Sequence, residues 1–221
     1  MTAPTARNGQ DVSHVIFDMD GTLVDNLELI IRSFNYAVAK FVGREFSKEE
    51  VLCRFGPTLE MMVAETVPKE DGRTAIARYH KYYGAFFHEY GRVYPGITEL
   101  ITALRQVSIV TSVCTGSDRR MTQTTLELSG LQNMFSAIVT ADDVREEKPD
   151  PEGLILTMQL VNAPAAQTIY LGDAARDIEA SKRAGIASAA VLWGVGKEAA
   201  LRAQEPDYVF DSPLDALRQL T

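Results

Sequence analysis

The chain has 221 residues, of which 46% are hydrophobic and 24% are charged. This composition is ordinary for a globular protein and excludes a disordered chain, and the length allows one sizeable core with a small accessory domain. A net charge of −8 argues against nucleic-acid binding through a broad basic face. No apolar run approaches the roughly 20 residues that cross a bilayer, so we expect no membrane association.

The N-terminal residues and the two cysteines lead to further expectations. Residues 1–10 are small and polar without the apolar stretch of a secretory signal, and we expect them to form a disordered tail. Cys53 and Cys114 belong to no CxxC pair, so we expect two reduced thiols, as in a cytoplasmic protein. Nothing in the sequence indicates the oligomeric state, and we expect a monomer or a homodimer.

The first elements are a strand followed by helices. An apolar run rich in branched residues, 12–17, predicts a buried strand that ends at the turn-forming run 18–21. From Leu27, apolar residues recur at three- and four-residue steps, which predicts a helix that Gly43 stops. Ser47 and Glu50 have the spacing of a capping box at the start of a second helix. Further helices are expected near 58–66 and 71–90, and no strand is predicted in this stretch.

Beyond a turn at 94–96, strands and helices alternate. The strands expected are 107–114, 137–140, 168–171, 187–192 and 208–210, and the helices are 97–104, 118–128, 151–161, 174–184, 197–203 and 213–220. Such alternation indicates βαβ units and a parallel sheet covered on both faces. We therefore predict an α/β fold, in which a Rossmann-like core of residues 11–26 and 94–221 carries a small all-helical domain, residues 27–93, inserted after the first strand.

Polar residues follow the expected strands. They are Asp18 and Asp20 after the first, Thr115, Gly116 and Ser117 after the second, Lys148 and Pro149 near the third, and Gly172, Asp173 and Asp177 after the fourth. Ligands of open α/β sheets bind beyond the carboxyl ends of the strands, so these residues should meet at one edge. Two carboxylates about 5 Å apart repel by roughly 3 kcal/mol at an effective dielectric constant near 20, so a cation is expected. The ligands are hard oxygens, which favours Mg²⁺.

The same segments resemble the motifs of the haloacid dehalogenase superfamily in its phosphatase form. Residues 18–25 resemble the first motif, 115–117 the second, 148–151 the third and 172–177 the fourth. Their order and spacing match, and the resemblance covers essentially the whole chain after the tail.

This resemblance implies a covalent mechanism. Asp18 would be the nucleophile that takes the phosphoryl group, and its carboxylate would also contact Mg²⁺. Asp20 would act as general acid and then as general base, and its main-chain carbonyl would bind the metal. The dehalogenases of this superfamily need no such acid and no metal, so a carboxylate at position 20 favours phosphorus chemistry.

The resemblance also implies roles for the other motifs. Thr115 and the Gly116 N–H group would hold the transferring phosphoryl oxygens. Lys148 would neutralise the nucleophile and the phosphate. Asp173 would bind the metal, and Asp177 would help to fix that arrangement.

Each motif has a simpler structural alternative. Asp18 and Asp20 could only form a turn, and Thr115 could be a late strand residue. Lys148 could be a solvated charge in a charged run. Asp173 could belong to a turn that caps a helix.

The inserted helices resemble the small helical cap of the first cap class. Arg54 and Gly56, in a break between helices, are candidates for substrate binding, and the alternative is an inter-helix turn with a surface arginine. The overall pattern is similar to phosphoglycolate phosphatases and to related bacterial inorganic pyrophosphatases. A helical cap leaves a small cavity, so we expect a small phosphorylated metabolite, phosphoglycolate-like, as the substrate.

We therefore expect a Mg²⁺-dependent phosphatase acting on a phosphomonoester. An inorganic pyrophosphatase and a β-phosphoglucomutase-type phosphotransferase are the alternatives, although no histidine or lysine of the insert clearly serves a mutase. A non-catalytic binding protein is a more remote alternative, because such a protein would be expected to lack at least one of Asp18, Asp20, Lys148 and Asp173, and all are present.

Overall fold

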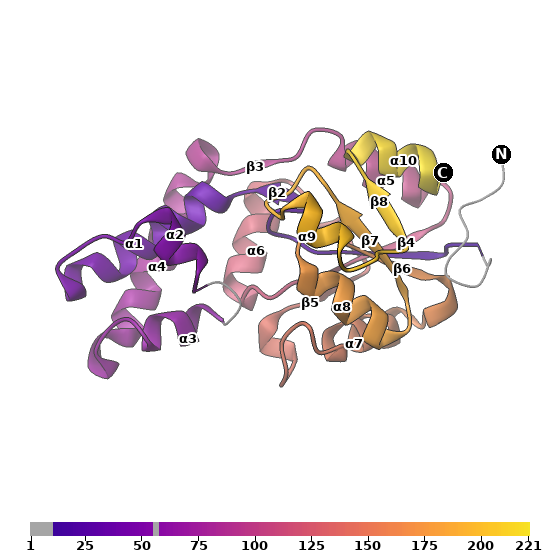
Figure 1. Cartoon of the computed structure of the whole chain (residues 1–221). Coiled ribbons are helices and arrows are strands. Elements are labelled where there is room, and N and C mark those ends of the chain that lie inside the picture. Colours follow the sequence, from indigo (N-terminus) through magenta and orange to yellow (C-terminus); the bar gives the residue numbers. More distant parts are fainter. Residues whose placement is uncertain (1–10, 55–57) are drawn as a thin grey trace.

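Within residues 11–54 and 58–221, which this computed structural model describes, six parallel strands form one sheet in the order β5-β4-β1-β6-β7-β8 (Figure 1). The strands are β1 (His14–Phe17), β4 (Val110–Cys114), β5 (Ala137–Val139), β6 (Thr168–Gly172), β7 (Ala187–Val191) and β8 (Tyr208–Phe210). β1 lies between β4 and β6, and all its residues are buried. The predicted α/β fold with a parallel sheet is confirmed.

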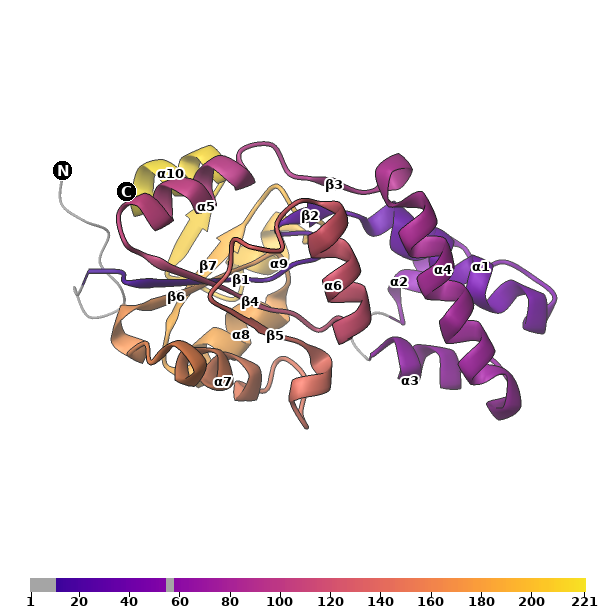
Figure 2. The same ribbon diagram turned by 180° about the vertical axis from the view of Figure 1, so that it is seen from behind.

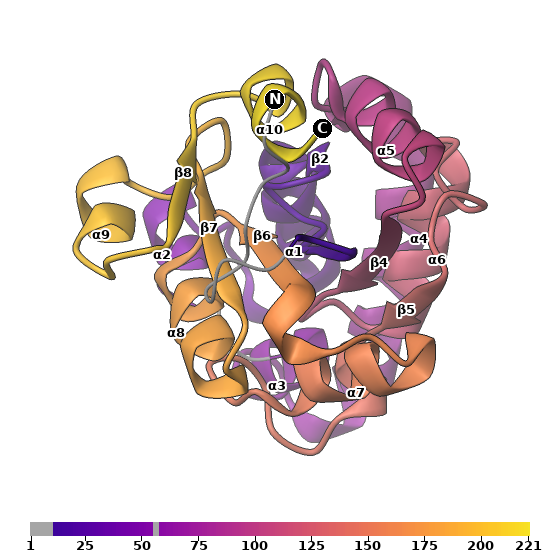
Figure 3. The same cartoon turned by 90° about the vertical axis from the view of Figure 1, so that its right-hand side faces the viewer.

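Helices cover both faces of this sheet. They are α5 (Ile97–Gln106), α6 (Arg119–Leu128), α7 (Glu152–Val161), α8 (Ala175–Ala184), α9 (Glu198–Arg202) and α10 (Pro213–Leu220). Figure 3 shows α5 and α10 side by side on one face, and α7 and α8 on the other. Short 3₁₀ segments lie at Lys69–Asp71, Ala141–Asp143 and Ala165–Gln167. The core between these layers includes Phe17, Leu171 and Val191, which have no exposed surface.

Helices α1 to α4 lie together beyond the carboxyl edge of the sheet and are called the helical insert below (Figures 1 and 2). Their bounds are α1 (Leu27–Val42), α2 (Lys48–Leu52), α3 (Leu59–Ala64) and α4 (Gly72–Tyr90). α1 and α4 pack against each other. Gly43 ends α1 in the left-handed conformation, and Ser47 and Glu50 form the predicted capping box of α2.

Two short strands flank the helical insert and are absent from the sequence prediction. β2 (Val24–Asp25) and β3 (Arg92–Val93) pair antiparallel, and the Arg92 guanidinium lies 2.6 Å from Asp25 Oδ2. A two-residue strand is too short to show an alternating pattern, so no periodicity could reveal this pair. They join the insert to the sheet at both of its ends.

The start of β4 also differs from the expectation. The strand begins at Val110 rather than at residue 107. α5 continues to Gln106, and Ser108 has a φ of 64°, which strand residues do not adopt. The apolar residues before Val110 therefore belong to the end of the helix and to a turn. They are as hydrophobic as the strand that follows, so the sequence pattern did not separate them from it.

Other expectations from the sequence have mixed outcomes. Cys53 and Cys114, both within the described part of the chain, are free, as predicted. None of the helices in that part is long and apolar enough to cross a membrane. The tail predicted over residues 1–10 lies outside the described residues.

His14 is a buried polar residue at the centre of the sheet. Its Nε2 is hydrogen-bonded to Ser112 Oγ at 2.9 Å, and its Nδ1 lies 3.4 Å from Thr168 Oγ1. Burial lowers the pKa of His14 to about 4, from an ordinary value of 6.5. The imidazole is therefore neutral in the folded protein at neutral pH.

This burial makes the free energy of unfolding depend on pH. The folded-state pKa of His14 is below the unfolded one, so the unfolded chain binds more protons between pH 6.5 and 4, and stability is lost as the pH falls through this window. The contribution reaches about 1.4 kcal/mol per pH unit. We expect the unfolding free energy of His14→Gln to fall less steeply than that of the wild type in urea titrations at pH 7.5, 6 and 5. Parallel pH profiles would contradict this assignment.

Candidate active site

A cavity opens where β1, β4 and β6 end. Its volume is about 890 Å³. Asp18 and Asp20 line it from the end of β1, Thr115 from the end of β4, and Asp173 from the end of β6. The chain crosses from one side of β1 to the other between β5 and β6, which creates the crevice in which α/β proteins bind ligands. The structure thus brings the predicted residues of these strands to one place.

Lys148 lies between two buried carboxylates. Its Nζ is 3.0 Å from Asp18 Oδ1 and 2.7 Å from Asp177 Oδ1, and the exposed fractions of the three side chains do not exceed 9%. The same Nζ donates a hydrogen bond to the Tyr170 hydroxyl at 2.8 Å, and that hydroxyl donates to the main-chain oxygen of Cys114, also at 2.8 Å. Lys148 is therefore held in place, and it is not a solvated charge.

Burial strongly affects the ionisation of this cluster. It raises the pKa of Asp18 to about 6, although Lys148 acts in the opposite direction. Burial, together with the charges of Asp177 and Asp18, raises the pKa of Asp173 to about 7. Burial acts to lower the pKa of Lys148, but Asp177 and Asp18 outweigh it, so the pKa is raised. The lysine is charged at neutral pH, while ionising both Asp18 and Asp173 requires further positive charge.

Glycines allow the main chain to close around Asp173. A Cβ atom on Gly21 would lie 2.3 Å from Asp173 Oδ2, and one on Gly194 would lie 2.4 Å from Asp173 Cβ. Gly21 also has a φ of 82°, a conformation that glycine adopts most readily. The Val195 N–H group donates to Asp173 Oδ2 at 2.8 Å. The position of this carboxylate is therefore fixed by backbone packing as well as by a hydrogen bond.

Asp18, Asp173 and Asp177 could hold a divalent cation. Each offers a carboxylate oxygen, and these oxygens lie within 4.8 Å of one another. Such a set of hard ligands fits Mg²⁺, and the positive charge would offset the cost of the buried carboxylates. Asp177 also accepts hydrogen bonds at both oxygens, from Lys148 at 2.7 Å and from the Ala174 N–H group at 2.9 Å. It therefore also fixes Lys148 and the first turn of α8.

Asp20 is held from two sides. Its Oδ1 accepts a hydrogen bond from Asn26 Nδ2 at 2.5 Å, and its Oδ2 accepts one from the Ser117 hydroxyl. Asn26 Nδ2 also donates to the Tyr83 hydroxyl at 2.8 Å, which is 2.9 Å from Thr125 Oγ1. Burial raises the pKa of Asp20, although the bonds from Ser117 and Asn26 act to lower it. A carboxyl group in this environment retains its proton more readily than an exposed one.

The loop after β4 presents its main chain to the cavity. Thr115 is 5% exposed, and its Oγ1 accepts a hydrogen bond from the Ser117 N–H group at 3.1 Å. Gly116 lines the cavity, and a Cβ atom there would meet no atom within 4 Å. Asp118 caps α6 through the Met121 N–H group, so a helix N-terminus lies next to this loop. Such a loop can bind an anion through its N–H groups.

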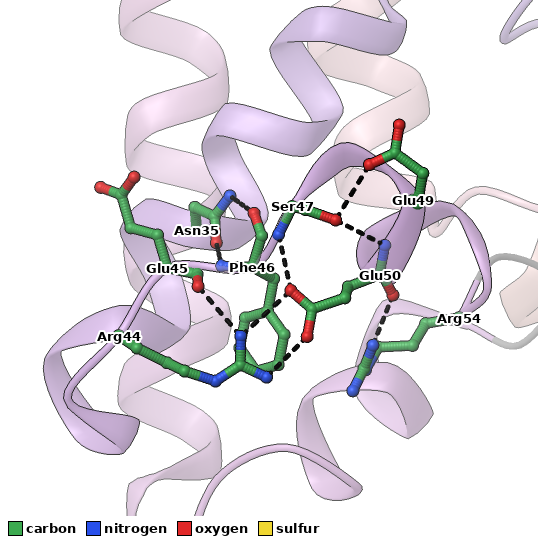
Figure 4. Close-up of polar contacts among 8 residues, drawn as sticks. All are labelled: Asn35, Arg44, Glu45, Phe46, Ser47, Glu49, Glu50 and Arg54. Carbon is green, nitrogen blue, oxygen red and sulfur yellow. Dashed lines mark hydrogen bonds and ion pairs between the residues drawn. The ribbon is translucent and has the colours of Figure 1, made fainter.

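Arg54 is not brought to the cavity. Its guanidinium donates a hydrogen bond to the main-chain oxygen of Glu50 and lies over the Phe46 ring, 4.7 Å from the ring centroid (Figure 4). Arg44 covers the same ring at 4.1 Å. Arg54 is not among the described residues that line the cavity, and Gly56, the other predicted contact of the insert, lies outside the described residues.

The sequence prediction does not include the roles of several residues in the site, although it names Ser117 in the polar run after the second strand. Ser117 and Asn26 hold Asp20, and Tyr170 holds Lys148. Ser117 lies within the polar run after the second strand, and Asn26 directly follows the first motif. The positions of both residues near the site could therefore have been predicted from the sequence. Tyr170 lies in a fully buried strand, and its sequence context does not distinguish it from an aromatic residue that only packs in the core. Its contact with Lys148 could therefore not be predicted.

Comparisons with known proteins agree with this fold. The family model of the haloacid dehalogenase-like hydrolases matches residues 15–191. A pyrophosphatase PpaX of Bacillus velezensis is 34% identical over 209 residues, which are 93% of this chain and 95% of that protein. Among solved structures, a predicted phosphoglycolate phosphatase from Haemophilus somnus has a TM-score of 0.85 at 23% identity, covering 95% of this chain and 98% of that one. The hydrolase SP0104 from Streptococcus pneumoniae has a TM-score of 0.77 at 26% identity, covering 95% and 99%.

The fold and the family match together define a hydrolase that acts on phosphate ester bonds. The chain belongs to the haloacid dehalogenase-like hydrolases. This confirms the resemblance that its motifs indicate.

The packing around Asp173 leads to a first prediction for the site. Gly194→Ala should displace the Asp173 carboxylate, because the added Cβ would lie 2.4 Å from Asp173 Cβ. Changes in the residues that support metal ligands typically weaken metal affinity by about 10- to 100-fold, and we expect a loss of this size for Mg²⁺ in calorimetric titrations. Gly72→Ala, whose Cβ would meet no atom within 4 Å, is the matched control and should bind as the wild type does. Equal affinities in all three proteins would exclude Asp173 as a ligand.

Proposed function

We propose that this chain is a Mg²⁺-dependent phosphomonoesterase that uses Asp18 as its nucleophile and acts on a small phosphorylated metabolite. The observation that carries the proposal is the position of the Asp18 carboxylate, 3.0 Å from the charged Lys148 and lining the cavity of about 890 Å³. A buried carboxylate with a paired cation can approach a phosphate dianion, because the lysine offsets the repulsion between the two anions.

In the first half-reaction, a carboxylate oxygen of Asp18 attacks phosphorus, and the bond from phosphorus to the leaving oxygen breaks. Asp20 donates its proton to that oxygen, so the product leaves as an alcohol. The raised pKa of Asp20, caused by burial, supports this acid role. The Thr115 hydroxyl, the Gly116 N–H group and Lys148 bind the phosphoryl oxygens, where negative charge is concentrated.

In the second half-reaction, water attacks phosphorus of the aspartyl-phosphate. Asp20, now ionised, accepts a proton from this water, and the bond between phosphorus and Asp18 breaks to release inorganic phosphate. The hydrogen bonds from Asn26 and Ser117 keep the Asp20 carboxyl group in place between the two steps. One carboxyl group therefore serves as acid and then as base.

Asp18, Asp173 and Asp177 would hold the metal in this mechanism, together with the main-chain carbonyl of Asp20. Mg²⁺ bound there would supply positive charge that offsets the charge of the phosphate and the repulsion between the carboxylates. The arrangement of the three carboxylates supports this assignment. Asp173 contributes a side chain fixed by the Val195 N–H group, and Asp177 contributes chiefly by holding Lys148.

The helical insert serves as a cap domain in this proposal. It extends over residues 27–93, and residues of α1, α3 and α4 line the cavity opposite the phosphoryl site. Such a cap excludes water from the reaction and contacts the leaving group of the substrate. Its two connections to the core run through the β2–β3 pair, which would act as the hinge.

Inorganic pyrophosphatase activity is the second candidate. It is supported by the 34% identity to a protein named pyrophosphatase PpaX over 93% of this chain. Pyrophosphate hydrolysis would use the same nucleophile and acid, with a second phosphate as the leaving group. The two candidates differ only in what the cap must contact.

Removal of the nucleophile tests the covalent mechanism. Asp18→Asn should lose more than about 10³-fold in kcat with Mg²⁺, because an amide oxygen is a much poorer nucleophile than a carboxylate. Acid-quenched wild type should carry the mass of one added phosphoryl group, and Asp18→Asn should not. Asp211→Asn, an exposed aspartate outside the cavity, is the control for the amide substitution. Wild-type turnover by Asp18→Asn, or turnover of the wild type in EDTA, would refute the mechanism.

Replacement of the general acid should give a different signature. Asp20→Asn should lose about 10²- to 10⁴-fold in kcat/KM, which reports the first half-reaction, for an alkyl phosphate, whose alkoxide is a poor leaving group without a proton. The loss should be smaller for para-nitrophenyl phosphate, because its phenolate leaves without protonation. Mg²⁺ affinity, measured by calorimetry, should remain that of the wild type. Equal losses for both substrates would show that Asp20 is not the acid.

A further inference from the structure

Apart from Tyr79, the described residues of the helical insert that line the cavity form an apolar wall. It is formed by Leu27, Ile30 and Phe34 of α1 and by Leu59, Met61 and Met62 of α3. These side chains face the same cavity as Asp18 and Asp20, so whatever is bonded to the phosphoryl group extends toward them. A surface of this composition favours hydrocarbon over charged groups.

The basic side chains of the cavity lie elsewhere. Among the described lining residues, Arg145, Lys148 and Arg176 are basic, and all three belong to the sheet part of the chain rather than to the insert. Lys148 is engaged by Asp18 and Asp177. The same set of lining residues contains six carboxylates, so acidic groups outnumber basic ones. A leaving group that extends toward the insert would meet an apolar wall and, among the described residues of the insert that line the cavity, no basic side chain that could pair with a carboxylate or phosphate.

Among the described residues of the insert that line the cavity, the one polar side chain is weakly engaged. Tyr79 of α4 lines the cavity and is 3% exposed, and its hydroxyl donates to Met121 Sδ at 3.4 Å. A thioether is a weak acceptor, so the hydroxyl could exchange it for an uncharged polar atom of a ligand. The Tyr79 hydroxyl can therefore form a hydrogen bond with an uncharged polar atom of the ligand, and the wall remains uncharged.

We infer that the substrate is a phosphomonoester of an uncharged, predominantly apolar alcohol or phenol, and that phosphoglycolate and pyrophosphate are poor substrates. This inference rests on the proposed phosphomonoesterase activity and specifies its leaving group. The cavity of about 890 Å³ includes the phosphoryl and metal sites, and its apolar wall adds room for a leaving group larger than a two-carbon acid. Burying a charge against hydrocarbon without a partner is costly, whereas each buried methylene favours binding.

The test is a series of alkyl phosphates that differ only in the apolar surface that the leaving alcohol can bury. Ethyl, butyl, hexyl and octyl phosphate have leaving alcohols of nearly equal acidity, and they are compared with phosphoglycolate and pyrophosphate by phosphate release with Mg²⁺. We expect kcat/KM to rise by about fourfold per added methylene until the cavity is full. Phosphoglycolate and pyrophosphate should be at least about tenfold poorer than hexyl phosphate.

The possible failures are distinguishable. Fastest turnover of phosphoglycolate or pyrophosphate, or equal kcat/KM along the alkyl series, would overturn the inference and leave the phosphatase proposal intact. No phosphate from any of these compounds would overturn the proposed function and this inference with it.

A lysine placed in the apolar wall gives an independent test. Met61 is 52% exposed on α3, so Met61→Lys should fold normally. We expect this variant to shift the ratio of kcat/KM for phosphoglycolate to that for hexyl phosphate in favour of phosphoglycolate by up to about fivefold, the size expected for a half-exposed ion pair. Leu160→Lys, the same kind of change at a 60% exposed position of α7 away from the cavity, should have the wild-type preference. An unchanged substrate preference in Met61→Lys would contradict the inference.

Discussion

The buried ion cluster of Asp18, Lys148 and Asp177 is the interaction on which the rest of the site depends. Charges lose the solvation of water when they are buried, and only close pairing offsets that cost. Removing one partner of such a cluster typically costs about 3–5 kcal/mol, because an uncompensated charge remains. The three residues come from the end of β1, from the segment before α7, and from α8. Their pairing therefore holds together three segments that are far apart in the sequence.

Backbone packing adds a second constraint. Asp173 is enclosed by the main chain at Gly21 and Gly194, and Trp193 Nε1 donates a hydrogen bond to the main-chain oxygen of Thr22 at 2.9 Å. The loop after β7 is thereby tied to the loop after β1. The acidic side chains are held close together by this packing, at a cost in repulsion that a bound cation can offset. The same packing therefore fixes the positions of the carboxylates and makes additional positive charge favourable beside them.

The sequence predicted the sheet and the residues at its carboxyl edge because parallel strands end at a common edge. It did not predict β2 and β3, because two-residue strands have no periodicity, and it did not predict the position of Arg54, because a side chain's partners depend on tertiary packing. Nor did it predict which apolar residues of the insert line the cavity. Phe34 and Tyr79 are buried in the core and also line the cavity, and helical periodicity is the same in both cases.

The separation of charge and hydrocarbon between the two walls of the cavity has an energetic consequence for selectivity. In the proposed function, the wall formed by the ends of β1, β4 and β6 would contact the phosphoryl group, which is common to all phosphomonoesters, so it would stabilise the transition state without selecting among alcohols. Selection falls to the apolar wall, where each buried methylene contributes about 0.8 kcal/mol. A charge on the leaving group is disfavoured there, because it would be buried without a partner. A cavity of this kind should therefore favour longer apolar alcohols step by step and disfavour anionic ones.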